Sequence, residues 1–322
     1  MQVKDLLKSS AFMMSLALIV ALLTNFSGMF PSDVLTSGRR ANITVLFLAL
    51  MMTLSLSRIP YKNLNPLTNA RSVARAVLLG LVVSSLIPLA GYYLLKGTAF
   101  ANEAMGLVFI AATPFAASVA PLSYILNGDM EHAARGTIIV YLVSLVWIPF
   151  IIWLTLGEFV DMTQVIITVV EIIGVPLILS RLITKVNISK DFMAIFMNCC
   201  IFLLVWLSVS STMFPSDVGI LVAFVIVAAL RSFFLGNVVE VTEKRMGIHW
   251  KQRVTDILMT SYKNKGIAIT MCVATLGPLA ASAMVAIATS IVVEILWVIF
   301  MDSVLFNRKR MARELAAEGS AE

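Results

Sequence analysis

The chain has 322 residues, of which 60% are hydrophobic and 13% are charged, and its mean hydropathy is +0.95. This composition excludes a single soluble globular domain and predicts a polytopic membrane protein whose main partner is the lipid bilayer. The formal net charge of +6 does not indicate a nucleic-acid partner, because the basic residues follow the membrane topology derived below.

Ten apolar stretches are long enough to cross a bilayer as helices, since about 20 apolar residues span its hydrocarbon core. In chain order they cover residues 11–30, 42–57, 72–95, 104–126, 135–156, 159–180, 192–213, 218–239, 254–276 and 280–304. They predict an all-α polytopic fold of ten transmembrane helices. Residues 240–253 form the longest polar stretch and are interpreted as a loop.

The Lys and Arg residues are distributed unevenly between the two sides of this arrangement. Eighteen of the 24 lie in the N-terminus, the even-numbered loops and the C-terminus, whereas the odd-numbered loops hold only Arg39, Arg40 and Lys96. By the positive-inside rule, we expect an integral protein of the cytoplasmic membrane with both termini in the cytoplasm.

The ten stretches form one transporter domain, residues 1–322, that divides into two sets of five, residues 1–157 and 158–322. Because five is odd, the second set is inserted upside down relative to the first, which is the arrangement of an inverted-topology repeat. In such transporters, corresponding spans of the two halves are interrupted near the midplane and frame the binding site. We therefore expect breaks in the fourth and ninth spans.

The fourth stretch contains two prolines, Pro114 and Pro121, seven residues apart. Each proline removes a backbone donor and clashes with the preceding turn, so residues 111–121 are predicted to be locally non-helical. Lipid cannot satisfy the carbonyl groups that such a break frees, and they must face protein or water. A simple kink is the alternative.

The ninth stretch carries Lys263 and Lys265, both about 15 Å or more from either end of the span at 1.5 Å per residue. A charge at the bilayer centre costs roughly 2.5–3.5 kcal/mol, and such residues usually face a water-filled cavity or a partner. Residues two apart point about 200° apart around a regular helix. Both lysines therefore reach one cavity only if the helix unwinds, with Gly266 as the candidate breaker. A continuous helix with one polar face is the alternative.

Three further charged residues lie inside the predicted spans: Glu171, Arg231 and Glu294. Each is a candidate charge partner within the membrane, beside Lys263 and Lys265. Arg231 could instead extend to the cytoplasmic surface. The sequence does not say which carboxylate neutralises a lysine. His132 and His249 are expected to be ordinary surface residues of cytoplasmic loops.

Three sections of the chain carry a family likeness. Residues 46–64, LFLALMMTLSLSRIPYKNL, combine an apolar helix, a Leu-containing turn and a polar-aliphatic loop. Residues 112–129, ATPFAASVAPLSYILNGD, match the spacing of a crossing helix that reads Cys-Pro-Gly-Gly-Thr-Ala-Ser-Asn. Residues 246–268, MGIHWKQRVTDILMTSYKNKGIA, match a ninth helix that contains Glu-X-X-X-Gln-Asn-Ser-Gly-Leu-Ala. In these sections the chain resembles the bile acid:sodium symporter family.

The resemblance implies a panel domain of helices 1, 2, 6 and 7 and a core domain of helices 3–5 and 8–10. Helices 4 and 9 unwind and cross in that core. Thr113, Ser118 and Asn264 would then lie at the crossing with the two lysines and bind the substrate.

The residues that would hold sodium are mostly missing. The family's coordinating glutamate falls on Met259, its glutamine on Lys263 and its serine on Lys265, while its Ser-Asn pair falls on Val119 and Ala120. Sodium prefers oxygen ligands, which these side chains lack. An ammonium group could instead occupy the space of the ion and bond the same carbonyls.

We therefore expect a secondary active transporter that moves a small organic anion by alternating access, with no cofactor, no metal site and no classical sodium coupling. The alternatives are sodium-coupled organic anion symport as in the family, proton coupling through a lysine, a membrane-embedded enzyme, or a channel. No HExxH, GxSxG or paired carboxylates favour the enzyme. The oligomeric state is not readable from the sequence.

Overall fold

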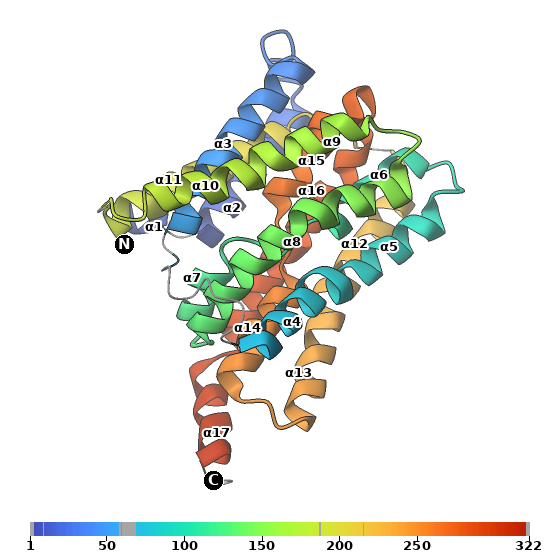
Figure 1. Cartoon of the computed structure of the whole chain (residues 1–322). Coiled ribbons are helices and arrows are strands. Elements are labelled where there is room, and N and C mark those ends of the chain that lie inside the picture. The colour runs from blue at the N-terminus through green and yellow to red at the C-terminus, as the bar shows by residue number, and fades with distance from the viewer. Residues whose placement is uncertain are drawn as a thin grey trace.

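The computed structural model describes residues 3–8, 10–57, 59, 69–186, 188–214 and 216–319. This part of the chain is helical and contains no strand (Figure 1). In chain order, the α-helices are α1 (Val3–Lys8), α2 (Ser10–Phe26), α3 (Ser37–Ser57), α4 (Ala70–Val77), α5 (Ser84–Leu95), α6 (Ala101–Ala112), α7 (Val119–Ile125), α8 (Met130–Leu156), α9 (Met162–Val169), α10 (Val175–Leu182), α11 (Lys190–Val209), α12 (Val218–Ala229), α13 (Leu235–Arg245), α14 (Trp250–Ser261), α15 (Lys265–Leu276), α16 (Ala280–Phe300) and α17 (Arg308–Gly319). Short π-helical segments, η3 (Leu78–Val83), η4 (Val170–Gly174), η5 (Leu230–Phe234) and η7 (Met301–Leu305), and a 3₁₀ turn, η6 (Gly277–Leu279), join or extend some of them.

Seven helical stretches within the described residues are long and apolar enough to cross a membrane. They are Gly38–Ser57, Ala70–Leu95, Met130–Leu156, Met162–Leu182, Asp191–Val209, Val218–Arg245 and Lys265–Leu305. Phe12–Phe26 and Ala101–Ala112 are shorter apolar helices. The chain is thus an all-α polytopic membrane protein, while the count of ten spans and the inverted repeat stay predictions.

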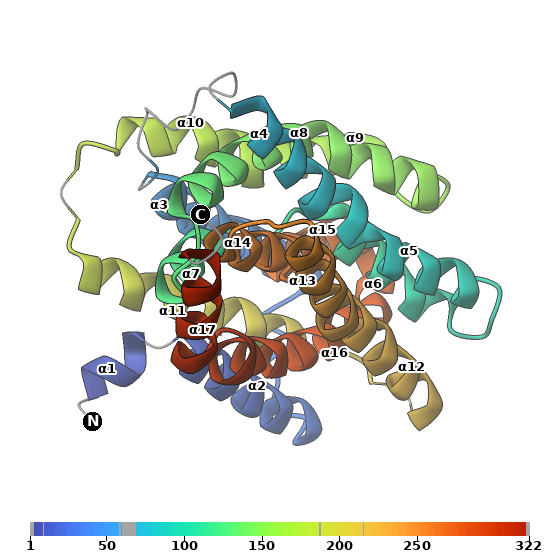
Figure 2. The ribbon, with the colours of Figure 1, turned by 90° about the horizontal axis from the view of Figure 1, so that it is seen from below.

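The helices pack in two groups. In the first, α11 packs against α2 and α3, and α3 also packs against α10. In the second, α6 packs against α5, α8 and α16, and α13 packs against α14. Helix α15 joins the groups because it contacts α3 on one side and α6 and α16 on the other. Figure 2 shows α14 and α15 near the centre of the molecule, with the other helices around them.

Two glycines determine how α16 lies against its neighbours. A Cβ on Gly106 of α6 would come within 2.0 Å of the carbonyl oxygen of Ala283 in α16, so only glycine allows this approach. Gly277 has φ +53° between α15 and α16, a left-handed conformation that glycine adopts at little steric cost. The chain therefore turns there, and α16 packs on both α6 and α15.

The prediction of a loop at residues 240–253 is wrong over most of its length. Helix α13 continues to Arg245 and α14 begins at Trp250, which leaves residues 246–249 as the connection. The continuous helix Val218–Arg245 has 28 residues and is about 42 Å long, which exceeds the roughly 30 Å hydrocarbon core. Its polar end therefore projects beyond the apolar layer as a helix, and hydropathy alone does not distinguish such an end from a loop.

Candidate functional site

Two helices are interrupted close to where the sequence predicts breaks. Helix α6 ends at Ala112 and α7 begins at Val119, so residues 113–118 are non-helical. Helix α14 ends at Ser261 and α15 begins at Lys265, so residues 262–264 are non-helical. Both interruptions are confirmed, and the first is shorter than the predicted range of residues 111–121 because neighbouring residues continue the helices.

Of the three predicted breakers, only Pro114 lies in a break. Pro121 falls in the first turn of α7, where the missing N–H of proline removes no helical hydrogen bond. Gly266 is helical, and a Cβ there would lie 2.8 Å from Cδ1 of Leu48. Its assignment as a breaker is wrong, since Gly266 instead allows close packing of α15 on α3. Asn264 caps the start of α15, because its Oδ1 accepts the N–H of Ile267 at 3.0 Å.

The two non-helical segments pair with each other. The N–H of Ala116 donates to the carbonyl of Tyr262 at 2.9 Å, and the N–H of Asn264 donates to the carbonyl of Pro114 at 2.9 Å. This pairing is an antiparallel bridge. It satisfies backbone groups that the breaks release inside the membrane, where lipid offers no partner. We call this arrangement of residues 113–118 and 262–264 the crossing.

Tyr141 of α8 holds the crossing from the side. Its hydroxyl donates to the carbonyl of Phe115 at 3.0 Å and accepts from Nδ2 of Asn264 at 2.7 Å. The Tyr141 side chain is fully buried. Tyr141 is not among the site residues predicted from the sequence, although a tyrosine inside an apolar stretch is a usable signal, because its buried hydroxyl needs a partner.

The Lys263 side chain ends in a cage of oxygen atoms. Its Nζ lies 2.6 Å from the carbonyl oxygen of Thr113, 3.2 Å from that of Ala111, 3.4 Å from that of Gly80 and 3.4 Å from Oγ of Ser85. The residue is 1% exposed. Because an ammonium group has three donors and no acceptor, a cage of acceptors suits the charged form of lysine.

The Lys265 side chain points instead to Glu294. Its Nζ lies 2.8 Å from Oε1 of Glu294, and the same carboxylate forms an ion pair with Arg231 and accepts the backbone N–H of Lys263 at 3.2 Å. Arg231 also donates to the carbonyl of Ser261 at 2.8 Å. All four charged side chains are buried. Two formal positive charges, those of Arg231 and Lys265, therefore meet the one formal negative charge of Glu294, while the ammonium group of Lys263 lies in its own oxygen cage.

Glu171 is not part of this charged cluster. It belongs to η4 and lines a separate cavity together with Asn42, Gln164 and Thr168. Glu294 is thus the carboxylate that the structure brings to Lys265. Arg231 does not reach the surface, since it is only 1% exposed.

A cavity of about 80 Å³ lies beside the crossing. Its polar lining residues are Ser118, Tyr262, Lys263, Asn264, Lys265 and Glu294. Met14, Met51 and Met197 contribute to the opposite, apolar wall from α2, α3 and α11. The cavity therefore lies between the two helix groups. Thr113 is not among its lining residues, and the Thr113 hydroxyl donates to the carbonyl of Ile110 at 3.0 Å.

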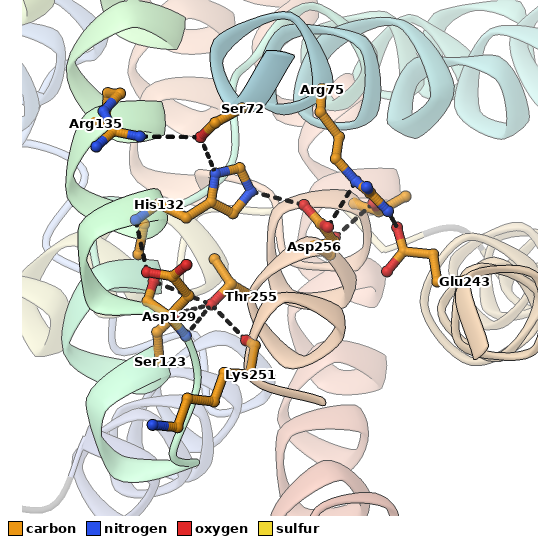
Figure 3. A network of polar contacts seen from close by, with 12 residues as sticks. Ser72, Arg75, Ser123, Asp129, His132, Arg135, Glu243, Lys251, Thr255 and Asp256 are labelled. Atoms are coloured by element: carbon orange, nitrogen blue, oxygen red, sulfur yellow. Dashed lines mark hydrogen bonds and ion pairs between the residues drawn. The ribbon is translucent and has the colours of Figure 1, made fainter. Parts of the chain in front are cut away.

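A second polar cluster lies where α4, α8, α13 and α14 meet (Figure 3). His132 is held between two side chains: its Nδ1 lies 2.6 Å from Oγ of Ser72, and its Nε2 lies 2.8 Å from Oδ1 of Asp256. Arg75 bridges two carboxylates, with Nε 2.7 Å from Oδ2 of Asp256 and NH2 2.6 Å from Oε1 of Glu243. We call these five residues the His132 cluster.

The expectation that His132 is a surface residue is wrong, because it is 2% exposed. His249 is exposed, as expected, with 71% of its side chain accessible. The missed signal was Asp256, an acidic residue inside a predicted span and seven residues before Lys263. A charge at that position indicates a buried partner, and His132 is one of its partners.

A family model described as the Sodium Bile acid symporter family matches residues 45–236, which is more than half of the chain. The match includes the first break and Arg231 and ends before α14. Comparison with curated proteins gives no match.

Proposed function

Since the chain belongs to the sodium bile acid symporter family, we propose that it is a secondary transporter that moves a small organic anion by alternating access. We further propose that the ammonium group of Lys263 replaces a sodium ion at the crossing. The observation that carries the proposal is the oxygen cage around Nζ of Lys263.

The packing supports a panel and a core domain in the proposed ten-span fold. The panel would comprise α2, α3, α9 with α10, and α11, and the core would comprise α4–α8 and α12–α16. The cavity lies between these two sets of helices. In this assignment the interrupted pairs α6–α7 and α14–α15 are the fourth and ninth spans, and residues 1–157 and 158–322 are the inverted repeats.

An orientation with both termini in the cytoplasm places the cavity on the cytoplasmic side of the crossing. Met14 lies near the start of α2, Met197 near the start of α11 and Met51 near the end of α3. All three helix ends are cytoplasmic in this orientation. The structure would then correspond to an inward-facing state, from which the anion is released to or taken from the cytoplasm.

Electrostatics argue against a sodium ion beside Lys263. Two unit positive charges 4 Å apart repel by about 4 kcal/mol at an effective dielectric constant near 20. The cage also supplies the carbonyl oxygens that a sodium ion would need, and the ammonium already uses them. A tethered cation of this kind would hold the two breaks together permanently, whereas a sodium ion would do so only when bound.

The charge around the crossing supports an anion as the substrate. Arg231 and Lys265 share the carboxylate of Glu294, and Lys263 adds a third buried cation to the crossing, so the site has a formal excess of two positive charges when all four groups are ionised. Lys265 lines the cavity and has one ion-pair partner, Glu294. An anionic substrate could therefore bind the face of Lys265 that points into the cavity. The small volume and the methionine wall favour a compact anion with a short apolar body.

Transport into proteoliposomes tests this function. A panel of radiolabelled small carboxylates (pyruvate, butyrate and benzoate among them) is offered in sodium chloride or choline chloride at equal ionic strength. We expect saturable uptake of at least one member, at equal rates in both salts. Lys265→Ser should lower this uptake at least tenfold, while Lys309→Ser, an exposed lysine of α17, should leave it unchanged.

The second candidate is sodium-coupled organic anion symport, which the family membership itself favours. It predicts uptake that rises steeply with sodium and falls to background in choline. That outcome would remove the proposed role of Lys263 but keep the assignment as a transporter. Uptake that grows linearly with substrate concentration, without saturation, would instead favour a channel.

A further inference from the structure

The His132 cluster carries an unbalanced charge. Asp256 is 0% exposed and Glu243 is 4% exposed, and their carboxylates share a single guanidinium, that of Arg75. With a neutral imidazole, the cluster has one excess negative charge. An uncompensated charge in a buried site is costly, so the cluster is balanced only when it also holds a proton.

The hydrogen-bond partners indicate which group carries this proton. Both ring nitrogens of His132 lie within hydrogen-bond distance of an oxygen, Nδ1 at 2.6 Å from Ser72 and Nε2 at 2.8 Å from Asp256. An imidazolium would therefore donate on both sides. Oε2 of Glu243 has no hydrogen-bond partner among the described residues, so a proton there would have no acceptor. The geometry favours the proton on His132.

The other charged groups around the imidazole are accounted for. Arg135 of α8 opposes an added positive charge, but its NH1 reaches only Oγ of Ser72, at 3.3 Å, and its side chain is partly exposed. The carboxylate of Asp129 caps α8 by accepting the N–H of His132 at 2.9 Å and so favours the charged ring.

On α13, Glu240 pairs with Arg253 and Arg310 and is balanced without His132. On α14, the side chain of Lys251 is exposed.

We propose that the His132 cluster is a proton-binding site, that His132 carries the proton, and that this proton is linked to the crossing. The link is made by two helices. Helix α8 carries His132 near its start and Tyr141, which binds the crossing, nine residues later. Helix α14 carries Asp256 and ends at Ser261, directly before the crossing.

The site is open to protons from one side of the membrane. The Arg75 side chain is 20% exposed, and in the proposed orientation it faces the cytoplasm. A proton that enters there would reach Asp256 and His132 directly. The link of this proton to transport rests on the proposed function, whereas the proton site itself rests only on the contacts of the cluster.

Histidine titration by nuclear magnetic resonance tests the proposal without any transport assay. The chain has only two histidines, so ¹⁵N-histidine labelling of the full protein gives two sets of ring signals, and His249→Gln assigns them. We expect the ring signals of His132 to show an imidazolium at a pH where those of the exposed His249 show a neutral ring. Glu243→Gln removes one negative charge and should shift the His132 signals at that pH towards the neutral ring. Glu131→Gln, at an exposed carboxylate beside His132 on the same helix, should leave them unchanged.

The link to the crossing has its own readout. Linkage is reciprocal, so a change at the crossing must alter proton binding at the cluster. Tyr141→Phe removes the hydroxyl that bonds the crossing and should change the fraction of His132 that is imidazolium at that pH. An unchanged fraction in this variant overturns the link. A His132 ring that stays neutral at pH values where His249 is already protonated overturns the site, whatever the transport assay shows.

Discussion

The ammonium group of Lys265 and the carboxylate of Glu294 lie 2.8 Å apart where α15 packs against α16, and both side chains are buried. The same carboxylate binds Arg231 and the backbone N–H of Lys263. Glu294 is therefore the shared counter-charge of the crossing, and it connects α16 to both α15 and the π-helical segment that carries Arg231.

Replacing Glu294 by glutamine should destabilise the protein strongly. The variant leaves Lys265 and Arg231 buried without their carboxylate, and breaking a buried ion pair by removing one partner costs about 3–5 kcal/mol. Thermal unfolding in detergent measures this loss. Glu171→Gln is the matched control, because Glu171 is a carboxylate in a helix of similar apolar character, is exposed and lies outside the cluster. A Glu294→Gln protein as stable as the Glu171→Gln protein would contradict the role of Glu294.

Replacing Tyr141 by phenylalanine should loosen the crossing with little change in volume. The variant removes the donor to Phe115 and the acceptor of Asn264, and each buried group left without a partner costs about 1–3 kcal/mol. We expect lower thermal stability and faster hydrogen exchange at Asn264. Tyr93→Phe, at an exposed tyrosine of α5, is the control and should behave as the wild type. Equal stability of the two variants would count against this contact.

The sequence predicts much of the crossing because charges and prolines are costly inside a membrane. Lys263, Lys265 and Pro114 lie in or directly beside the breaks that their chemistry indicates. The bounds of the breaks were harder to predict, because Pro121 and Gly266 are compatible with the first turn of a helix. The starting point of α15 depends on the cap at Asn264, which is a local hydrogen bond and not a matter of hydropathy.

Contacts between side chains that lie far apart in the sequence could not be predicted from the sequence alone. Glu171 and Glu294 are equally plausible counter-charges in the sequence, and only the packing of α15 against α16 selects Glu294. The sequence predicts a surface position for His132 because it lies in a cytoplasmic loop between the fourth and fifth predicted spans. Its burial depends on Ser72 and Asp256, which belong to helices far away in the sequence.

Cysteine labelling should locate the α13–α14 connection. On a background in which Cys199, Cys200 and Cys272 are replaced, His249→Cys introduces an exposed thiol. In the proposed orientation, a membrane-impermeant maleimide should label it in inside-out vesicles and leave it unmodified in intact cells. Labelling from outside intact cells would reverse the orientation and place the cavity on the other side of the membrane.

The attachment of α17 should weaken in acid. Burial alone would raise the pKa of Glu314, but the hydrogen bonds and charges of Arg253 and Lys244 outweigh this effect and hold the pKa below its ordinary value of 4.5. A group whose folded pKa is lowered stabilises the fold above its unfolded pKa, and this contribution is lost as the pH falls through the folded pKa. Glu314 should therefore help to hold α17 above about pH 4.5 and release it progressively at lower pH.

Hydrogen exchange in α17, corrected for the intrinsic rate at each pH, measures this attachment. We expect high protection in the wild type near neutral pH and a loss of protection below about pH 4.5. Glu314→Gln lacks the charge at every pH, so its protection should be lower near neutral pH and should change less in acid. Identical pH profiles for the two proteins would show that Glu314 does not hold the helix.

Binding of ²²Na⁺ to the purified protein tests most directly whether Lys263 takes the place of a sodium ion. The measurement is made at constant ionic strength with choline as the replacing cation. We expect no saturable sodium binding in the wild type, because the ammonium group occupies the oxygen cage at 2.6–3.4 Å from its acceptors. The double variant Met259→Glu with Lys263→Gln removes that charge and restores a carboxylate, and it should gain sodium binding. Saturable binding of sodium to the wild type would contradict the account.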